Sequence, residues 1–184
     1  PGISSMIVGD HQVGQKLVDD KNIALVSFTG STKVGRMVGR NVAERFGKSI
    51  LELGGNNAII ISKDADINMT IIGAVFGAVG TAGQRCTSTR RLIIHEDVYD
   101  DVISRLQKAY AQIKIGNPLD ENNHVGPLID KDAVSQYLNS IEKCKKEGGN
   151  FIVEGGVLEG EGFDSGCYVK PCIAEVENSF EVVQ

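Results

Sequence analysis

The sequence has no tryptophan, three histidines and no excess of positive charge. Its net charge is −5 and it contains no basic run, which argues against nucleic-acid binding. Its main apolar run, residues 71–82, is short and broken by glycines, so no segment is expected to cross a membrane. None of the histidines lies in a setting that marks a metal ligand or a catalytic base. We therefore expect neither a metal site nor a cysteine–histidine hydrolase.

The four cysteines, Cys86, Cys144, Cys167 and Cys172, have no paired spacing of the kind found in zinc sites or small secreted scaffolds. We expect free thiols in a reducing compartment. A bridge between Cys167 and Cys172 in an oxidising compartment is the alternative. With 41% hydrophobic and 23% charged residues, the composition is otherwise that of a soluble globular protein.

Both ends of the sequence suggest an internal piece of a longer chain. The first residue, Pro1, is not an initiator methionine, and Gln184 directly follows an apolar run at 180–183 that reads as a strand. We therefore expect part of any active site to lie outside these 184 residues.

Apolar runs and helical periodicities alternate along the chain. Strands are expected at 23–28, 49–53, 58–61, 92–95, 151–153 and 168–170, and helices at 13–18, 32–46, 64–82, 98–113 and 131–147. In the second helix, Val34, Val38, Val42 and Phe46 form one apolar face, and Gly47 suits the position that ends it. Asp10 and Asp130 are expected to cap the first and the last helix, and Leu138 is expected on the inner face of the last one. Alternation of this kind predicts an α/β fold with a mainly parallel sheet. A boundary is plausible near residues 48–53.

Residues 30–35, Gly-Ser-Thr-Lys-Val-Gly, lie between an expected strand and an expected helix. Backbone N–H groups and the positive end of a helix can hold a phosphate at such a turn. The alternative is a simple strand-to-helix turn in which Ser31 caps the helix.

Glu52 stands between two leucines and directly before Gly54-Gly55. A carboxylate in this apolar setting is expected to be partly desolvated, which suits a general base. The glycines permit close approach of a ligand. The alternative is a strand-end glutamate that points to solvent.

Cys86 lies in the polar stretch Gly83-Gln84-Arg85-Cys86-Thr87-Ser88, between two apolar segments. The neighbouring charge of Arg85 favours the thiolate, which is the nucleophilic form of cysteine. The alternative is a buried structural thiol. We interpret Cys86 as the nucleophile and Glu52 as a base that works with it on a carbonyl carbon.

Taken in order, the three signals resemble the aldehyde dehydrogenase superfamily. Residues 28–35 look like its cofactor turn, residues 51–58 like its glutamate signature and residues 83–86 like its cysteine signature. The stretches 116–118 and 126–128 are also similar, so the resemblance covers essentially the whole chain. It implies that residues 1–50 are the C-terminal part of a Rossmann-like NAD-binding domain. Residues 51–184 would then be most of the catalytic cysteine domain, truncated.

Several residue choices resemble the antiquitin branch, among them the stretch 53–57, Leu-Gly-Gly-Asn-Asn, and the stretch 78–86 that ends at the cysteine. Many other branches have lysine in place of Asn56. The resemblance implies NAD-dependent oxidation of 2-aminoadipic 6-semialdehyde in lysine breakdown. It further implies that the full-length protein is a homo-oligomer, a tetramer, in the cytosol or the mitochondrial matrix.

The resemblance also assigns roles to residues of this sequence. Cys86 would add to the aldehyde to give a thiohemiacetal, hydride would pass to the nicotinamide, and Glu52 would activate the water that releases the acid. The Cys86 backbone N–H would be one oxyanion donor. The remaining positions are two substrate residues, Arg85 and Thr87, and four cofactor-binding residues, Gly30, Ser31, Val34 and Leu53.

Arg85 has two candidate roles. Its guanidinium could pair with an anionic substrate tail, or it could act as a charge that stabilises the thiolate or simply lies at the surface. Two other readings of the whole chain stay open. One is a different branch of the superfamily, such as a betaine-aldehyde or CoA-acylating enzyme, and the other is a non-catalytic structural relative. We expect the 184-residue piece alone to be inactive.

Overall fold

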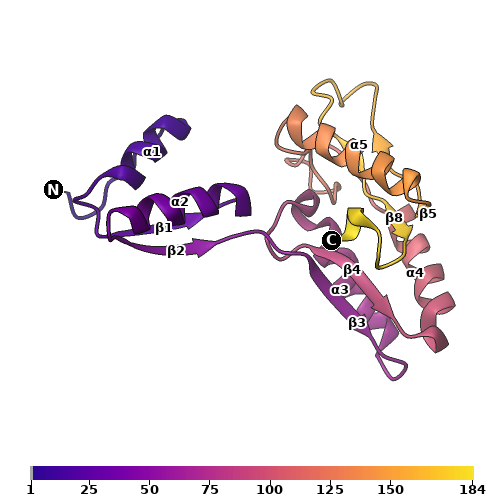
Figure 1. Cartoon of the computed structure of the whole chain (residues 1–184). Coiled ribbons are helices and arrows are strands. Elements are labelled where there is room, and N and C mark those ends of the chain that lie inside the picture. Colours follow the sequence, from indigo (N-terminus) through magenta and orange to yellow (C-terminus); the bar gives the residue numbers. More distant parts are fainter. Residues whose placement is uncertain (1) are drawn as a thin grey trace. The chain divides into compact units, whose positions relative to one another are not determined.

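The computed structural model describes residues 2–184, and these form two compact units that divide between Gly55 and Asn56 (Figure 1). Each unit is described by itself. None of the helices in residues 2–184 combines the length and the apolar character that crossing a membrane requires.

The first unit contains two helices and a pair of parallel strands. In chain order these are α1 (His11–Asp19), β1 (Leu25–Thr29), α2 (Thr32–Glu44) and β2 (Lys48–Glu52). The small core of this unit consists of Val18, Val38 and Val42, against which Val26, Phe28 and Leu51 pack. As the sequence predicts, Asp10 and Ser31 cap α1 and α2, because each side chain accepts a hydrogen bond from an N–H of the first turn.

The end of α2 corrects one prediction. The helix stops at Glu44, and Phe46, expected on its apolar face, has a positive φ of 60° and is 97% exposed. Phe46 donates its N–H to Ala43 O, and Gly47 donates its N–H to Val42 O, which is the hydrogen-bond pattern of a Schellman motif. Position 47 favours glycine for a steric reason rather than for its backbone conformation, because a Cβ on residue 47 would lie 3.0 Å from the Val42 side chain.

The second unit carries most of the secondary structure. In chain order its elements are β3 (Asn57–Ile61), α3 (Ile67–Val79), β4 (Thr89–Ile94), α4 (Tyr99–Ala111), α5 (Lys131–Lys146), β5 (Asn150–Val153), β6 (Gly156–Val157), β7 (Val169–Lys170) and β8 (Ile173–Glu175). Strands β3 and β4 pair in parallel, whereas β5 pairs with β8 and β6 with β7 in antiparallel fashion.

Two clusters form the core of the second unit. The larger one joins α3, α4 and the strand β3 through Ala74, Val102, Leu106 and Ile61. The smaller one surrounds α5 and consists of Leu128, Val134 and Val169. Burial of these side chains fixes β3 and β4 against α3, and this fixes both ends of the loop between α3 and β4.

Four sequence predictions in this unit need correction. The helix expected to reach residue 82 ends at Val79, and the one expected to reach residue 113 ends at Ala111. Leu138, expected on the inner face of α5, is 38% exposed. The run at 180–183 forms a short 3₁₀ turn, Glu181–Val183, rather than a strand.

Candidate functional site

The loop that carries Cys86 begins with an unusual turn. After α3 ends, Thr81, Ala82 and Gly83 have positive φ values of 55°, 52° and 70°. Glycine adopts this conformation freely, whereas a β-branched residue such as Thr81 adopts it at a cost. The helix ends at Val79 with Gly80 as its C-cap, and the three left-handed residues that follow turn the chain toward the Cys86 loop.

Two reciprocal hydrogen bonds close the loop around Cys86. The Arg85 N–H donates to Ser88 Oγ over 3.1 Å, and the Ser88 N–H donates to Arg85 O over 3.1 Å. Ser88 is only 2% exposed, whereas Cys86 is exposed. The backbone N–H of Cys86 has no hydrogen-bond partner within residues 2–184. The loop therefore presents a thiol together with a free backbone donor.

Asn57, the first residue of β3, holds the same loop from the side. Its Nδ2 donates to Cys86 O over 2.6 Å and to Ser88 O over 3.0 Å. A register shift between β3 and β4 follows directly after the pair Asn57 and Thr89. In the sequence, Asn57 stands in two stretches that resemble the family, and neither indicates this contact. The bond joins residues 29 positions apart, so no local pattern could have revealed it.

Gln84 ties the loop to a second segment. Its Oε1 accepts the Ile129 N–H over 2.9 Å, and its Nε2 donates to Thr81 O over 3.3 Å. The Gly-Gln-x-Cys stretch and the stretch around Gly126-Pro127 are therefore held together by one side chain. Both stretches resemble the family in the sequence, but no local pattern connects them.

Arg85 points toward α3. Its Nη2 donates to Phe76 O over 3.3 Å, and its guanidinium carbon lies 5.0 Å from the centre of the Phe76 ring. Its Nε is buried and has no hydrogen-bond partner among residues 2–184. Thr87, the other residue predicted to contact substrate, is exposed.

A cavity of about 660 Å³ lies behind the loop. Gln84, Ser88 and Thr89 contribute to its wall, and Cys86 is not one of the lining residues. Within residues 2–184, no group of three or more histidine, cysteine, aspartate or glutamate side chains is arranged to hold a metal ion.

The turn between β1 and α2 has features that fit a phosphate group. Ser31 Oγ accepts the Val34 N–H over 3.3 Å, so Ser31 caps the helix. The first N–H groups of a 13-residue helix have no partner within the helix, and its N-terminus carries partial positive charge. The turn can therefore serve as a cap and as an anion site at once. Gly30 and Val34 are exposed here.

Glu52 lies at the end of β2, next to this turn. Its carbonyl oxygen accepts the Gly30 N–H over 3.0 Å. Its side chain is exposed rather than partly desolvated, because neighbours in β2 alternate in direction and the flanking leucines do not cover it. Leu53 packs so closely against Gly35 that a Cβ on residue 35 would overlap the Leu53 side chain. Within the first unit, the structure thus brings together the turn, Glu52 and Leu53.

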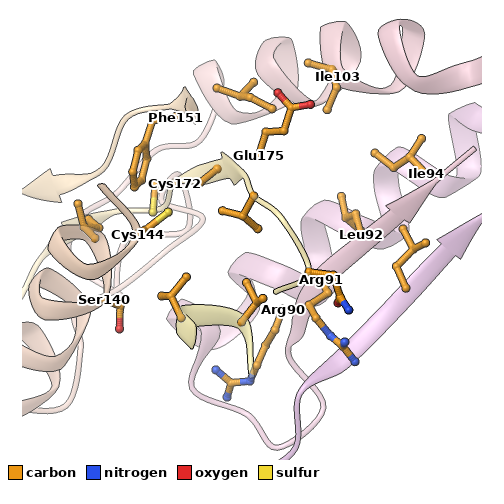
Figure 2. Close-up of a pocket in the computed structure, with 18 of the residues that line it drawn as sticks. Arg90, Arg91, Leu92, Ile94, Ile103, Ser140, Cys144, Phe151, Cys172 and Glu175 are labelled. Atoms are coloured by element: carbon orange, nitrogen blue, oxygen red, sulfur yellow. The ribbon is translucent and has the colours of Figure 1, made fainter. Parts of the chain in front are cut away.

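A second cavity of about 500 Å³ contains two other cysteines in its wall (Figure 2). Figure 2 shows Cys144 and Cys172 on one side of it, opposite Leu92 and Ile94. Burial raises the pKa of both thiols, and Glu147 raises that of Cys144 further. Burial also raises the pKa of the neighbouring Tyr137, whose hydroxyl accepts the Gly156 N–H over 3.0 Å.

The sequence as a whole matches one family model, described as the aldehyde dehydrogenase family, over residues 1–184. The chain belongs to the aldehyde dehydrogenase family. The α/β fold predicted from the sequence is confirmed as a part of the aldehyde dehydrogenase fold.

Two curated relatives and one solved structure illustrate the match. The chain is 51% identical over 174 residues to alpha-aminoadipic semialdehyde dehydrogenase of Bos taurus, covering 94% of this chain and 32% of that protein. It is 48% identical over 185 residues to aldehyde dehydrogenase family 7 member A1 of Pisum sativum, covering 100% and 36%. Betaine aldehyde dehydrogenase of Staphylococcus aureus in complex with NAD⁺ has a TM-score of 0.91 at 29% identity, covering 97% and 36%. The chain thus spans about a third of the length of these aldehyde dehydrogenases.

Proposed function

We propose that this protein oxidises an aldehyde, 2-aminoadipic 6-semialdehyde, to the carboxylic acid with NAD as the hydride acceptor. Cys86 is the nucleophile and Glu52 is the general base. The observation that carries the proposal is the Cys86 loop, which combines an exposed thiol with a free backbone N–H. The 51% identity to the bovine semialdehyde dehydrogenase supports this choice of substrate.

The chemistry at Cys86 follows from its surroundings. The thiolate adds to the aldehyde carbon, the C–S bond forms and the carbonyl oxygen becomes an oxyanion. The Cys86 N–H donates a hydrogen bond to that oxygen and stabilises the charge. Loss of hydride from the thiohemiacetal leaves a thioester on the sulfur. Thiolate is both a strong nucleophile and an acceptable leaving group, so the same atom serves both halves of the reaction.

Glu52 acts in the second half. Its carboxylate takes a proton from water, the resulting hydroxide adds to the thioester carbon, and the C–S bond breaks to release the acid and the thiolate. The groups of the proposed reaction come from both units. Residues up to Gly55 contribute the cofactor turn and the base, and residues from Asn56 onward contribute the nucleophile.

The first unit provides the groups that would hold the cofactor. When bound, NAD supplies a two-electron acceptor in its nicotinamide ring. The N-terminus of α2, with Gly30 and Ser31, would hold the pyrophosphate, and Val34 lies one turn further along. Leu53 would lie toward the nicotinamide. The absence of a Gly-x-Gly-x-x-Gly pattern is consistent with binding of this kind, because the free N–H groups of one helix end provide the donors.

Arg85 and Thr87 form the substrate pocket in this proposal. One face of the Arg85 guanidinium lies over Phe76 and one N–H is bonded to Phe76 O, so other N–H groups remain for the carboxylate of the substrate tail. In the full-length protein, Arg85→Ala should raise KM for an acidic aldehyde by about tenfold or more and change KM for a neutral aldehyde much less. Equal effects on both substrates would remove this role.

The experiment that tests the function is NADH formation by the full-length protein with 2-aminoadipic 6-semialdehyde, followed at 340 nm. The proposal predicts turnover with this aldehyde at a higher kcat/KM than with betaine aldehyde. A requirement for coenzyme A would favour the acylating branch, and no turnover with any aldehyde would favour a structural relative. The full-length protein is also proposed to be a homotetramer, which light scattering after size exclusion would test.

A further inference from the structure

Two adjacent asparagines at the start of β3 make different contacts. Asn57 Nδ2 donates to the carbonyl oxygens of Cys86 and Ser88. Asn56 Nδ2 donates instead to Val183 O over 2.8 Å, and its own carbonyl accepts two N–H groups of Arg91. The two side chains therefore hold different parts of the second unit, although they are neighbours in the sequence.

The bond from Asn57 fixes the direction of a peptide group. The described chain has no cis peptide bonds, so the C=O of Cys86 and the N–H of Thr87 point in opposite directions. When Asn57 holds the C=O, the Thr87 N–H must face away from β3. The same reasoning applies one peptide earlier, where Ser88 holds Arg85 O and thereby turns the Cys86 N–H away. Both peptide planes beside the Cys86 Cα are thus set by named partners.

These two planes determine where the sulfur points. The Cα–Cβ bond of Cys86 has a fixed direction relative to its two peptide planes, and only the χ1 rotation remains free. The loop has no regular secondary structure of its own to hold it, and it follows three residues with positive φ. The register shift between β3 and β4 also begins at Asn57, and such irregularities recur beside active sites.

We propose that Asn57 is a positioning residue, which holds the Cys86 peptide so that the sulfur and the Cys86 N–H are presented together to the aldehyde. This inference rests on the proposed function for its effect on turnover, but its effect on thiol reactivity is independent of that function. Asn57 touches the loop and not the reacting atoms, so it is not itself catalytic.

The test compares Asn57→Ala and Asn57→Asp with the matched control Asn56→Ala in the full-length protein. Aspartate has nearly the shape of asparagine but presents an oxygen to two carbonyl oxygens, where asparagine donates N–H groups. The proposal therefore expects Asn57→Asp to be at least as damaging as Asn57→Ala. A role in packing alone would leave the aspartate variant close to wild type.

Two measurements are made on each variant. The first is the rate of Cys86 alkylation by iodoacetamide across pH 6–9, read from the mass of the tryptic peptide 86–90. The second is kcat and KM for the aldehyde, with the folded fraction checked by circular dichroism at the assay temperature. We expect kcat to fall by about tenfold to a hundredfold in both Asn57 variants, with KM changed much less. We expect the profile of alkylation rate against pH to change in both and to stay as in wild type in Asn56→Ala.

Three outcomes would overturn the proposal. One is an alkylation profile of Asn57→Asp that matches that of Asn56→Ala. Another is a loss of kcat that merely follows the unfolded fraction. The third is an equal loss of kcat in Asn57→Ala and in Asn56→Ala. If the wild-type protein proves inactive toward aldehydes, the proposed function fails, whereas the alkylation profiles still decide whether Asn57 positions Cys86. Should Asn57→Ala fail to fold, Asn57→Leu, which has nearly the size of asparagine and no donor, replaces it in both measurements.

Discussion

The second unit holds cysteines in two contrasting regions. In the loop between α3 and β4, Cys86 is exposed and its backbone is held by Asn57 and Ser88. Beside α5, Cys144 is 5% exposed, and burial raises the pKa of its thiol and of the Cys172 thiol. The first region fixes the backbone and leaves the sulfur open, whereas the second buries the sulfur.

The two regions differ in the conditions that decide how reactive a thiol is. Reactivity needs the thiolate and access to it, and burial in apolar surroundings opposes both. The sequence marks Cys86 by the polar stretch around it, but it does not show which of the other three thiols are buried. The ranking comes from the loop geometry around Cys86 and from the core around Cys144.

The largest effect is expected from removing the sulfur of Cys86. Cys86→Ala in the full-length protein should lower kcat for aldehyde oxidation by about three orders of magnitude or more, because no other group can form the thioester. Cys144→Ala should keep kcat within about threefold, since a buried thiol acts only in packing. Steady-state NADH formation checks both. Comparable losses in the two variants would end the contrast.

Replacing the base should separate the two halves of the reaction. Glu52→Gln should slow steady-state turnover by about a hundredfold or more, because water is then activated poorly. It should still give a rapid burst of about one NADH per active site, since the thioester forms without the base. Stopped-flow absorbance measures the burst. A slow phase with no burst would assign Glu52 to the first half of the reaction instead.

Alkylation of the native protein should rank the thiols directly. At pH 7.5, iodoacetamide should modify Cys86 about a hundredfold faster than Cys144, because the buried thiol reacts only after local opening. Quantitative peptide mapping over time gives both rates. In urea the two rates should converge. Similar rates in the native protein would mean that burial does not protect Cys144.

The hydrogen bond from the Ile129 N–H to the Gln84 side chain should contribute to stability on a smaller scale. Gln84→Ala leaves the Ile129 N–H without its acceptor, so the free energy of unfolding should fall by about 1–2 kcal/mol. The control is Gln112→Ala, whose side chain bonds only to Lys108 O on an exposed face of α4. Urea unfolding measures both variants. Equal losses would show that Gln84 has no special role in holding the loop.

The smallest effect concerns pH. Burial raises the pKa of the Cys144 and Cys172 thiols above the ordinary value of 9.0 and raises the pKa of Tyr110 to about 12. Below pH 9 these groups are neutral in both states, so their contribution to stability is complete. Above it the unfolded chain ionises first, and the free energy of unfolding should fall as the pH rises toward 12. Tyr110→Phe should reduce this fall, and urea titrations at pH 8 and pH 10.5 check it.

Local signals in the sequence predicted much of the fold. Asp10, Ser31 and Asp130 each cap the helix that the sequence predicts after them, because a cap depends only on residues two or three positions away. The end of α2 was harder to predict. Gly47 was expected to take the left-handed conformation, but Phe46 takes it. Gly47 follows at a position where the Val42 side chain leaves too little space for a Cβ.

Candidate residues of the site could be named from the sequence, whereas the contacts that hold them could not. Cys86 could be singled out as a candidate because it stands in a polar stretch between apolar segments. The bonds from Asn57 and Gln84 join residues 29 and 45 positions apart, and no periodicity encodes such pairs. The exposure of Glu52 was missed for a related reason. The leucines on either side of Glu52 point to the opposite face of the strand, so their apolar character did not indicate burial of Glu52.

The central claim is that Cys86 carries the covalent intermediate. The most direct measurement is peptide mapping of the full-length Glu52→Gln protein, quenched in acid after one turnover with NAD and 2-aminoadipic 6-semialdehyde. The account predicts an acyl adduct on the tryptic peptide 86–90, at about one equivalent per active site. An adduct on a peptide that contains Cys144, Cys167 or Cys172, or turnover with no adduct on any cysteine, would contradict it.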